Sequence, residues 1–314
     1  MSNREVAHTR DGYGKGLVEV AEQNENVVAL CADLAESTRT HWFKEKFPNR
    51  YIEMGVAEQN LAATASGLAA AGKIPFIASY AAFSPGRNYE QIRTTTALNE
   101  MPVKVVGCHA GLSVGPDGAT HQMLEDIGLM RMLPNMRVFV PCDMHEARKT
   151  IHAMVDNTDK PDYIRLGREK TPVMTTEDTE FVPGKAYLLR EVEDPQVLII
   201  GAGPVLANAL DAADELESGG IMVNVLNSHT IKPLDTETIL REAQKVKLVV
   251  TIEEHQAAGG LGSAVAEFLS QNHPVKMKII GVNDRFGQSG NPDELYKEYG
   301  LDTASIADLI KHAL

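Results

Sequence analysis

The strongest constraint on the fold is a regular alternation of apolar and amphipathic runs from Gly14 to about Arg168. Apolar runs of strand length follow one another with helix-length runs between them. This rhythm is typical of βαβ units and predicts a mostly parallel sheet. The predicted strands are NVVALCADL, IPFIASY, VKVVG, RVFVP and YIRLG, and the clearest helical runs are YGKGLVEVAEQ and DMHEARKTIHAMV.

A second block with the same alternation begins near Gln196, after the charged, threonine-rich connector EKTPVMTTEDTEFVPGK. Its apolar runs are VLIIGAGP, IMVNVL, KLVVTIEE and VKMKIIGV, and helical runs such as LANALDAADELESGG separate them. A chain of 314 residues is long enough for about two domains that each bury a core. We therefore expect an α/β protein with a first domain at residues 1–185 and a smaller α/β domain at residues 186–314.

Composition excludes several classes of partner. The formal net charge is −13, and the acidic residues are spread along the chain. Such a surface disfavours nucleic acid, and a phosphorylated ligand would need a local cluster of cations. The spacing of Cys31, Cys108 and Cys142 fits neither a disulfide framework nor a zinc site. There is no apolar signal segment and no window near the roughly 18 apolar residues of a membrane span, so we expect a cytoplasmic chain.

The run MGVAEQN places one carboxylate, Glu58, among apolar and small residues. RYIE before it is typical of a short strand, and LAATASGLAAAG after it is typical of a helix that ends at a glycine. A carboxylate in an apolar setting is unfavourable unless it is paired or protonated, so its presence points to a ligand. The alternative is an acid in the first helical turn that complements the helix dipole.

A second candidate segment is the glycine-rich loop CHAGLSVGPDGATHQ, which follows the apolar strand VKVVG. It contains His109, Asp117 and His121. Loops that leave the carboxyl ends of strands in α/β sheets are the usual place of ligand binding. A single histidine is more often structural, but two histidines and an aspartate on such a loop favour a functional site.

Three motifs in this order, MGVAEQN, SYAAFSPGRNYEQIR and GPDGATHQ, resemble the pyrimidine-binding domain of transketolase. The likeness extends through ADLAES, LPNMRVFVP and the tail motif EEHQAAGGLGSAVAEFL, so it covers nearly the whole chain. It implies that the first domain is a pyrimidine-binding domain of thiamine-diphosphate enzymes and that the second is a transketolase C-terminal domain.

Transketolases hold the diphosphate through Mg²⁺ on a GDG motif that an asparagine follows, in a preceding domain. This sequence has no such arrangement; PDGAT belongs to the histidine loop. The chain thus resembles the C-terminal subunit of a split transketolase. We expect a partner, an N-terminal subunit that carries the GDG motif and holds Mg²⁺, so that thiamine diphosphate is shared and no metal ligand lies in this chain. The resemblance also implies self-association in an α₂β₂-type complex.

The resemblance implies roles for cofactor residues. Glu58 matches the catalytic glutamate that donates a hydrogen bond to N1′ of the aminopyrimidine, which lets its 4′-amino group act as the base at C2. An apolar pocket is expected to keep Glu58 protonated for this task. Tyr80 and Phe83 match residues of the pyrimidine pocket, with Phe83 as the stacking partner, although both could be core aromatics. Asp33 and Leu34 match a pair that reaches cofactor bound mainly by the neighbouring subunit.

The substrate residues are also implied by the resemblance. His121 matches a histidine that helps to move a proton while the donor ketose is cleaved, and Asp117 matches a contact to a substrate hydroxyl. Arg87 lies where the sequence departs from transketolase toward the synthase and dehydrogenase branches, so its role stays open. The positions that match the phosphate grip of the family are Arg10, Ser37, His109 and Arg168.

The resulting hypothesis is the transfer of a two-carbon ketol unit from a ketose phosphate to an aldose phosphate. One alternative is a subunit like deoxyxylulose-phosphate synthase or the β-subunit of 2-oxoacid dehydrogenases, which would decarboxylate an oxoacid. Another is a non-catalytic scaffold subunit, which has no need of Glu58 and His121. The loop GPDGATHQ and the pair Arg10 and Arg168 favour the sugar phosphate.

Overall fold

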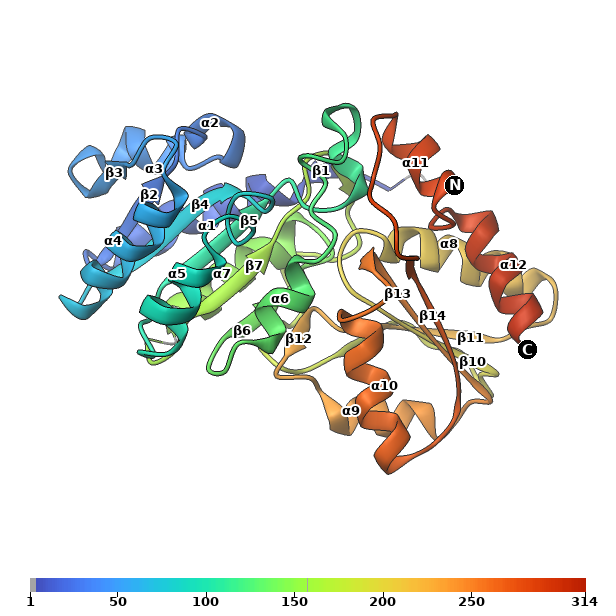
Figure 1. Ribbon diagram of the computed structural model, residues 1–314. Coiled ribbons are helices and arrows are strands. Elements are labelled where there is room, and N and C mark those ends of the chain that lie inside the picture. The colour runs from blue at the N-terminus through green and yellow to red at the C-terminus, as the bar shows by residue number, and fades with distance from the viewer. Residues whose placement is uncertain (1–3, 157) are drawn as a thin grey trace.

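The computed structural model describes residues 4–156 and 158–314, which form two α/β units side by side (Figure 1). The first unit has a seven-stranded sheet in the order β12-β6-β7-β5-β4-β2-β3. Neighbouring strands are parallel except for β12 and β6. The strands are β2 (Val27–Cys31), β3 (Tyr51–Glu53), β4 (Ile74–Tyr80), β5 (Lys104–Cys108), β6 (Arg137–Phe139), β7 (Asp162–Arg165) and β12 (Thr230–Lys232).

The central strands are buried on both faces, which explains their nearly continuous apolar sequences. Every residue of β2, β5 and β7 is buried. The charged residues among them are paired, because Lys104 Nζ lies 2.7 Å from Asp162 Oδ2 with both side chains fully buried. The prediction of an α/β fold with a mostly parallel sheet is confirmed.

Helices pack on both faces of this sheet. They are α1 (Thr9–Gln23), α2 (Ala35–Thr38), α3 (His41–Lys46), α4 (Glu58–Ala70), α5 (Tyr89–Gln91), α6 (Asp126–Met132) and α7 (Met144–Asp156), with short η segments at Pro48–Arg50, Ile92–Ala97 and Leu112–Asp117. Helix α1 begins earlier than its predicted run and crosses α7 closely. A Cβ on Gly12 would lie 2.1 Å from Met144 O. This close approach requires glycine, although glycine weakens a helix by about 1 kcal/mol.

The second unit has a five-stranded sheet in the order β14-β13-β10-β11-β9, in which β9 is antiparallel to β11 and the other neighbours are parallel. Its strands are β9 (Tyr187–Arg190), β10 (Val197–Gly201), β11 (Val223–Asn227), β13 (Leu248–Gln256) and β14 (Lys276–Val282). Its helices are α8 (Leu206–Ser218), α9 (Thr236–Ala243), α10 (Leu261–Asn272), α11 (Pro292–Glu298) and α12 (Thr303–Ala313).

The two units are joined by strand pairing and by buried side chains as well as by the connecting segment. Strand β12 comes from the second block of the sequence but pairs with β6 of the first sheet. The segment predicted as a connector contains β8 (Lys170–Pro172), which pairs with β1 (Val6–His8). One buried cluster joins side chains of both units, such as Val105 and Val249. Across residues 4–156 and 158–314, no helix combines the length and apolar character needed to cross a membrane.

Candidate active site

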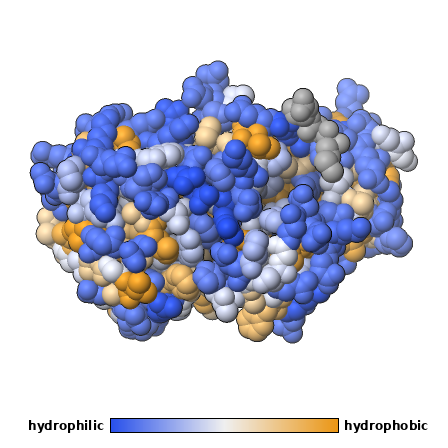
Figure 2. All heavy atoms as spheres, turned by 90° about the horizontal axis from the view of Figure 1, so that it is seen from above, coloured by the Kyte–Doolittle hydropathy of each residue, from blue (hydrophilic) through white to orange (hydrophobic). Residues whose placement is uncertain are grey.

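The carboxyl ends of the central strands lie at the edge of the first sheet that is uppermost in Figure 1. The loop after β2 carries Asp33 and Leu34, β4 ends at Tyr80, and the loop after β5 begins at His109. Figure 2 looks onto this side of the molecule and shows a mostly hydrophilic surface with separate hydrophobic patches. Parallel topology therefore gathers the candidate residues at one edge, where ligands bind in such sheets.

An aromatic cluster forms the centre of the site. The rings of Tyr80 and His109 stack with their centroids 4.0 Å apart. Phe83 lies 5.9 Å from Tyr80 and meets the edge of His121 at 5.4 Å. The structure thus brings together four predicted site residues from two loops. The alternative that Tyr80 and Phe83 are ordinary core aromatics is not favoured, because both are only partly buried at this edge.

Arg10 joins the cluster from the first turn of α1. Its Nη1 donates to Ser37 O at 2.8 Å and lies 3.4 Å from His109 Nε2. The predicted residues Arg10, Ser37 and His109 are therefore neighbours, although Ser37 meets Arg10 through its main chain. Because a guanidinium only donates hydrogen bonds, His109 Nε2 must accept here and Nδ1 carries the proton.

His109 presents an unused donor. Burial, with the nearby charge of Arg10 next in effect, lowers the pKa of His109 to about 3. The imidazole is therefore neutral near neutral pH. Among the described residues, its buried Nδ1 and the buried Nε of Arg10 have no hydrogen-bond partner. Buried polar atoms are normally satisfied, so this pair is suited to an oxygen-rich ligand.

The lowered pKa of His109 predicts a pH-dependent stability. An unfolded histidine takes up a proton below about pH 6.5, whereas folded His109 does so only near pH 3. The contribution of neutral His109 to the free energy of unfolding is therefore complete above about pH 6.5. Between that pH and the folded pKa, it falls by about 1.4 kcal/mol for each pH unit on acidification. Denaturant unfolding between about pH 6 and pH 4 should show a shallower slope for His109→Asn than for the wild type. His312→Asn, on the exposed end of α12, controls for loss of an imidazole; equal slopes for His109→Asn and wild type would contradict the assignment.

Arg168 and Asp117 form an ion pair. Arg168 Nη1 lies 3.3 Å from Asp117 Oδ1 and donates to Val114 O at 2.7 Å. Both side chains keep about a third of their surface exposed, at 31% and 35%. Two predicted substrate residues are thus adjacent, and a bound phosphate would compete with Asp117 for Arg168.

Glu58 is the first residue of α4, and its side chain is 1% exposed. Arg87 Nη1 donates to Glu58 Oε2 at 2.9 Å. The Arg87 guanidinium also lies over the Phe83 ring, 4.9 Å from its centroid. The Glu58 main chain is held as well, because Asn88 Nδ2 donates to Glu58 O at 3.0 Å.

The ion pair between Arg87 and Glu58 was not predicted from the sequence. Its one signal is the spacing of four residues from Phe83, which puts the two side chains on one side of a helical turn. The ion pair also adds a condition to the role of Glu58. An ion pair favours the charged carboxylate, whereas the role implied by the resemblance needs a protonated one, so this contact differs from the expected apolar pocket.

Asp33 and Leu34 lie on the loop after β2, and Asp33 is exposed with a left-handed φ of 58°. Glu53 fixes this loop, because its Oε1 accepts hydrogen bonds from Asp33 N at 2.8 Å and Gly55 N at 3.1 Å. Glu53 was not singled out from the sequence. It links the ADL segment to the start of MGVAEQN. Asp33 is exposed and Leu34 is partly buried, so both can be reached from outside this chain.

The groups present fit the pyrimidine half of thiamine diphosphate: a buried carboxyl group, Glu58, and partly buried aromatic rings, which Arg87 links. Within residues 4–156 and 158–314, no cluster of three His, Cys, Asp or Glu side chains is placed to hold a metal ion.

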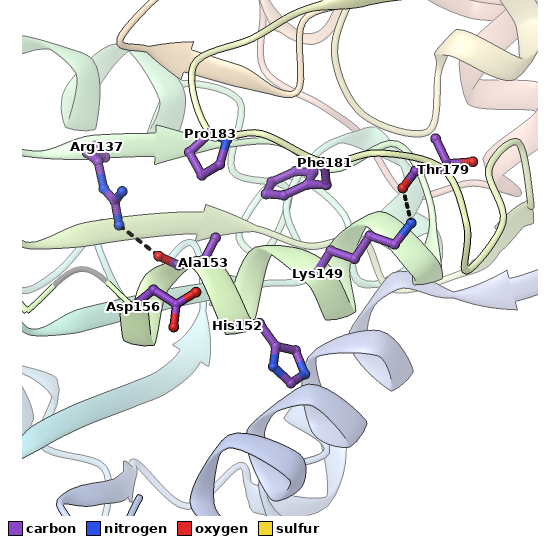
Figure 3. A pocket seen from close by; sticks show the side chains of 8 residues that line it. All are labelled: Arg137, Lys149, His152, Ala153, Asp156, Thr179, Phe181 and Pro183. Carbon is purple, nitrogen blue, oxygen red and sulfur yellow. Dashed lines mark hydrogen bonds between the residues drawn. The ribbon is translucent and has the colours of Figure 1, made fainter. Parts of the chain in front are cut away.

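A separate cavity of about 540 Å³ lies near the end of α7 (Figure 3). Arg137 starts β6 and Asp156 ends α7, so the cavity is at the amino edge of the sheet, away from the candidate site. Its basic side chains are already engaged: Arg137 pairs with Asp162, His152 contacts Glu19, and Lys149 donates to main-chain oxygens. We assign no function to it.

Comparison with known proteins decides the family. Residues 5–174 match the family model of the transketolase pyrimidine binding domain, and residues 184–306 match that of the transketolase C-terminal domain. The chain belongs to the transketolase family. Both halves of the predicted family fold are thereby confirmed.

Relatives in this family include separately encoded subunits. The chain is 42% identical to a 6-deoxy-6-sulfo-D-fructose transketolase subunit of Clostridium sp., over 95% of this chain and 91% of the relative. It is 37% identical to one subunit of the apulose-4-phosphate transketolase of Phocaeicola vulgatus, over 98% and 97%. A solved structure described as a split gene transketolase, inactive beta4 tetramer, is 43% identical with a TM-score of 0.91 and covers 98% of each chain. The chain is a transketolase-family subunit of a split transketolase-like enzyme.

Proposed function

We propose that this chain is the C-terminal subunit of a thiamine-diphosphate-dependent transketolase that moves a two-carbon ketol unit from a ketose phosphate to an aldose phosphate. The observation that carries the proposal is buried Glu58, whose ion-pair partner Arg87 lies over the Phe83 ring. Phe83 in turn contacts Tyr80 and His121, and Tyr80 stacks on His109. An acid, flat rings and imidazoles at one edge are the groups that such chemistry needs. A partner subunit supplies the GDG motif, the diphosphate site and Mg²⁺.

Glu58, Tyr80 and Phe83 would hold the aminopyrimidine ring. When bound, the cofactor supplies a carbon acid at C2 and an amino group that can take its proton. Glu58, once protonated, would donate a hydrogen bond to N1′, and Phe83 would offer the flat surface for the ring. Asp33 and Leu34 extend the contact toward the half held by the partner.

At the substrate end, Arg10, Ser37, His109 and Arg168 receive the phosphorylated sugar. The unpartnered N–H groups of Arg10 and His109 offer donors without a protonated imidazole. His121, partly buried beside Phe83, moves a proton at the reacting carbonyl, and Asp117 accepts from a substrate hydroxyl. The cations offset the net negative charge of the chain where a phosphate must enter.

The sugar itself is a separate question. The relatives named for sulfofructose and apulose phosphate show that the family serves several sugars. The alternative of a decarboxylating subunit, like deoxyxylulose-phosphate synthase or a 2-oxoacid dehydrogenase β-subunit, rests on the segment around Arg87. The cluster of Arg10, His109 and Arg168 favours a sugar phosphate over pyruvate.

The direct test mixes the purified chain with a subunit that carries the GDG motif, thiamine diphosphate and Mg²⁺. Two-carbon transfer from xylulose 5-phosphate to an aldose phosphate is the expected activity. Release of CO₂ from pyruvate is the competing readout. Decarboxylation without ketol transfer would support the synthase or dehydrogenase alternative instead. If neither activity is detected, the scaffold alternative would be supported.

Arg168→Ala should raise the KM for phosphorylated donors by about tenfold to a hundredfold, because a charge-assisted grip contributes about 1.5–3 kcal/mol. The KM for non-phosphorylated donors should change little. Arg168→Lys keeps the charge and controls for loss of the contacts to Val114 and Asp117. An equal effect on both kinds of donor would show that Arg168 is structural.

A further inference from the structure

The tail motif EEHQAAGGLGSAVAEFL has no role in the proposed chemistry, yet it reaches the candidate site. Its first residues lie on β13 of the second unit and are buried. Glu254 Oε1 accepts a hydrogen bond from Ser113 N at 2.6 Å, inside the histidine loop. The next residue, His255, accepts from Gly128 N of α6 at 3.2 Å through Nε2. Two consecutive side chains of β13 therefore hold main chain of the first unit.

Glu254 is itself held both at its carboxyl group and at its main chain. Tyr296 OH on α11 donates to Glu254 Oε2 at 3.1 Å, and Arg165 Nη2 donates to Glu254 O at 2.7 Å. Burial raises the pKa of Glu254, while the charge of Arg165 and the hydrogen bond from Ser113 oppose that rise. A side chain that is 4% exposed and held this way is a rigid acceptor.

Two glycines of the histidine loop allow the second unit to approach closely. Gly111 has a left-handed φ of 88°, and a Cβ there would lie 2.5 Å from Glu254 Cδ. Gly118 has a φ of 72°, and its Cβ would lie 2.5 Å from Ser289 Oγ. Glycine is needed at both positions for the backbone conformation and for the close approach of the second unit.

A further contact holds the other end of the loop. Gln122, the neighbour of His121, donates from Nε2 to Leu112 O at 3.0 Å and to Gln288 O at 3.0 Å. Gln288 belongs to the segment between β14 and α11 of the second unit. The loop is thus held at Ser113 and at Gln122. Asp117 and His121 lie between these two points.

We propose that the C-terminal unit is a positioning element of the active site, in which Glu254 holds the histidine loop at Ser113 so that Asp117 and His121 stay aligned on the substrate. The inference rests on the proposed function, because it takes these two residues as substrate contacts. Glu254 does not touch the substrate. It acts through the main chain of the loop.

The first test needs the chain alone and no activity. Glu254→Leu removes the acceptor at similar size, and amide hydrogen exchange of the segment around Ser113 should become at least tenfold faster. Glu254→Gln keeps an oxygen for Ser113 N and an amide for Tyr296, so it should restore most of the protection. The matched control is Glu253→Leu, in which a neighbouring buried carboxylate that accepts from Leu261 N and Gly262 N at 2.8 Å each is removed.

The second test uses the complex with the partner subunit, thiamine diphosphate and Mg²⁺. Glu254→Leu should lower kcat/KM for ketol transfer at least tenfold while leaving the Kd for the cofactor within about twofold, because Glu58, Tyr80 and Phe83 lie on other segments. Glu253→Leu should lower the midpoint temperature of unfolding without a selective loss of kcat/KM. If Glu254→Leu cannot be purified, Tyr296→Phe, which removes one donor to Glu254, takes its place.

The outcomes separate the two proposals. Unchanged exchange near Ser113 in Glu254→Leu, or an equal kinetic effect of Glu253→Leu, would overturn the positioning role. Absence of ketol transfer in the wild-type complex would instead overturn the proposed function, while the exchange result would still decide whether Glu254 orders the loop.

Discussion

Glu58→Gln is expected to slow exchange of the C2 proton of bound thiamine diphosphate by about two to four orders of magnitude, the usual size of a general acid-base contribution. Glutamine has nearly the same shape, but its amide is far too weak an acid to share or transfer a proton to N1′ as a carboxyl group does. Fold and assembly should persist, because Asn88 holds the Glu58 main chain and not its carboxyl group. Deuterium exchange at C2, followed by NMR in the complex with the partner subunit, measures the effect.

Arg87→Met is the informative companion variant. It removes the cation that lies 2.9 Å from Glu58 Oε2 and leaves the carboxyl group in place. The Arg87 side chain is 45% exposed, so the ion pair contributes about 1 kcal/mol or less. Cofactor binding should therefore tighten by up to about fivefold, with exchange as fast as in the wild type. If Glu58→Gln exchanged the C2 proton at the wild-type rate, the proposed role of Glu58 would be wrong. Weaker cofactor binding in Arg87→Met would instead indicate that Arg87 contacts the cofactor.

The second large effect is the dependence on a partner. The chain alone should bind thiamine diphosphate poorly and show no ketol transfer, and a subunit with the GDG and asparagine motif should restore both. The diphosphate carries several negative charges, and Mg²⁺ prefers carboxylate, amide and water oxygens in octahedral geometry. This sequence has no GDG motif for that ion, so the partner is expected to supply it.

Calorimetric titration of cofactor and Mg²⁺ into the chain, with and without the partner, measures this dependence. The related solved structure described as an inactive beta4 tetramer makes the oligomeric state of the chain alone a useful second readout. We expect self-association without activity, and an α₂β₂-type complex once the partner is added. Mg²⁺-dependent micromolar binding with turnover in the chain alone would refute the split-enzyme proposal.

Local sequence patterns were enough for the central strands and several of the main helices, whereas β1, β8 and β12 were not predicted. The runs that became β2, β4 and β5 are apolar because helices cover both faces of the sheet, and this property is visible in the sequence itself. The helix after MGVAEQN was also predictable, because small residues continue to a glycine stop. The motif order pointed to Glu58 and His121 as candidates, while their catalytic roles remain proposals.

Local sequence patterns could not decide which side chains meet. Arg10 lies 99 residues from His109, and Glu254 lies 141 residues from Ser113, so no local preference could pair them. The addition of β12 to the first sheet and the ion pair of Arg87 with Glu58 were equally hidden. Helix and strand signals depend on neighbouring residues, whereas these contacts depend on how two packed units approach each other. The sequence by itself therefore determined the central elements and the candidate chemistry, and the packing of the second unit against the first determined how the histidine loop is held.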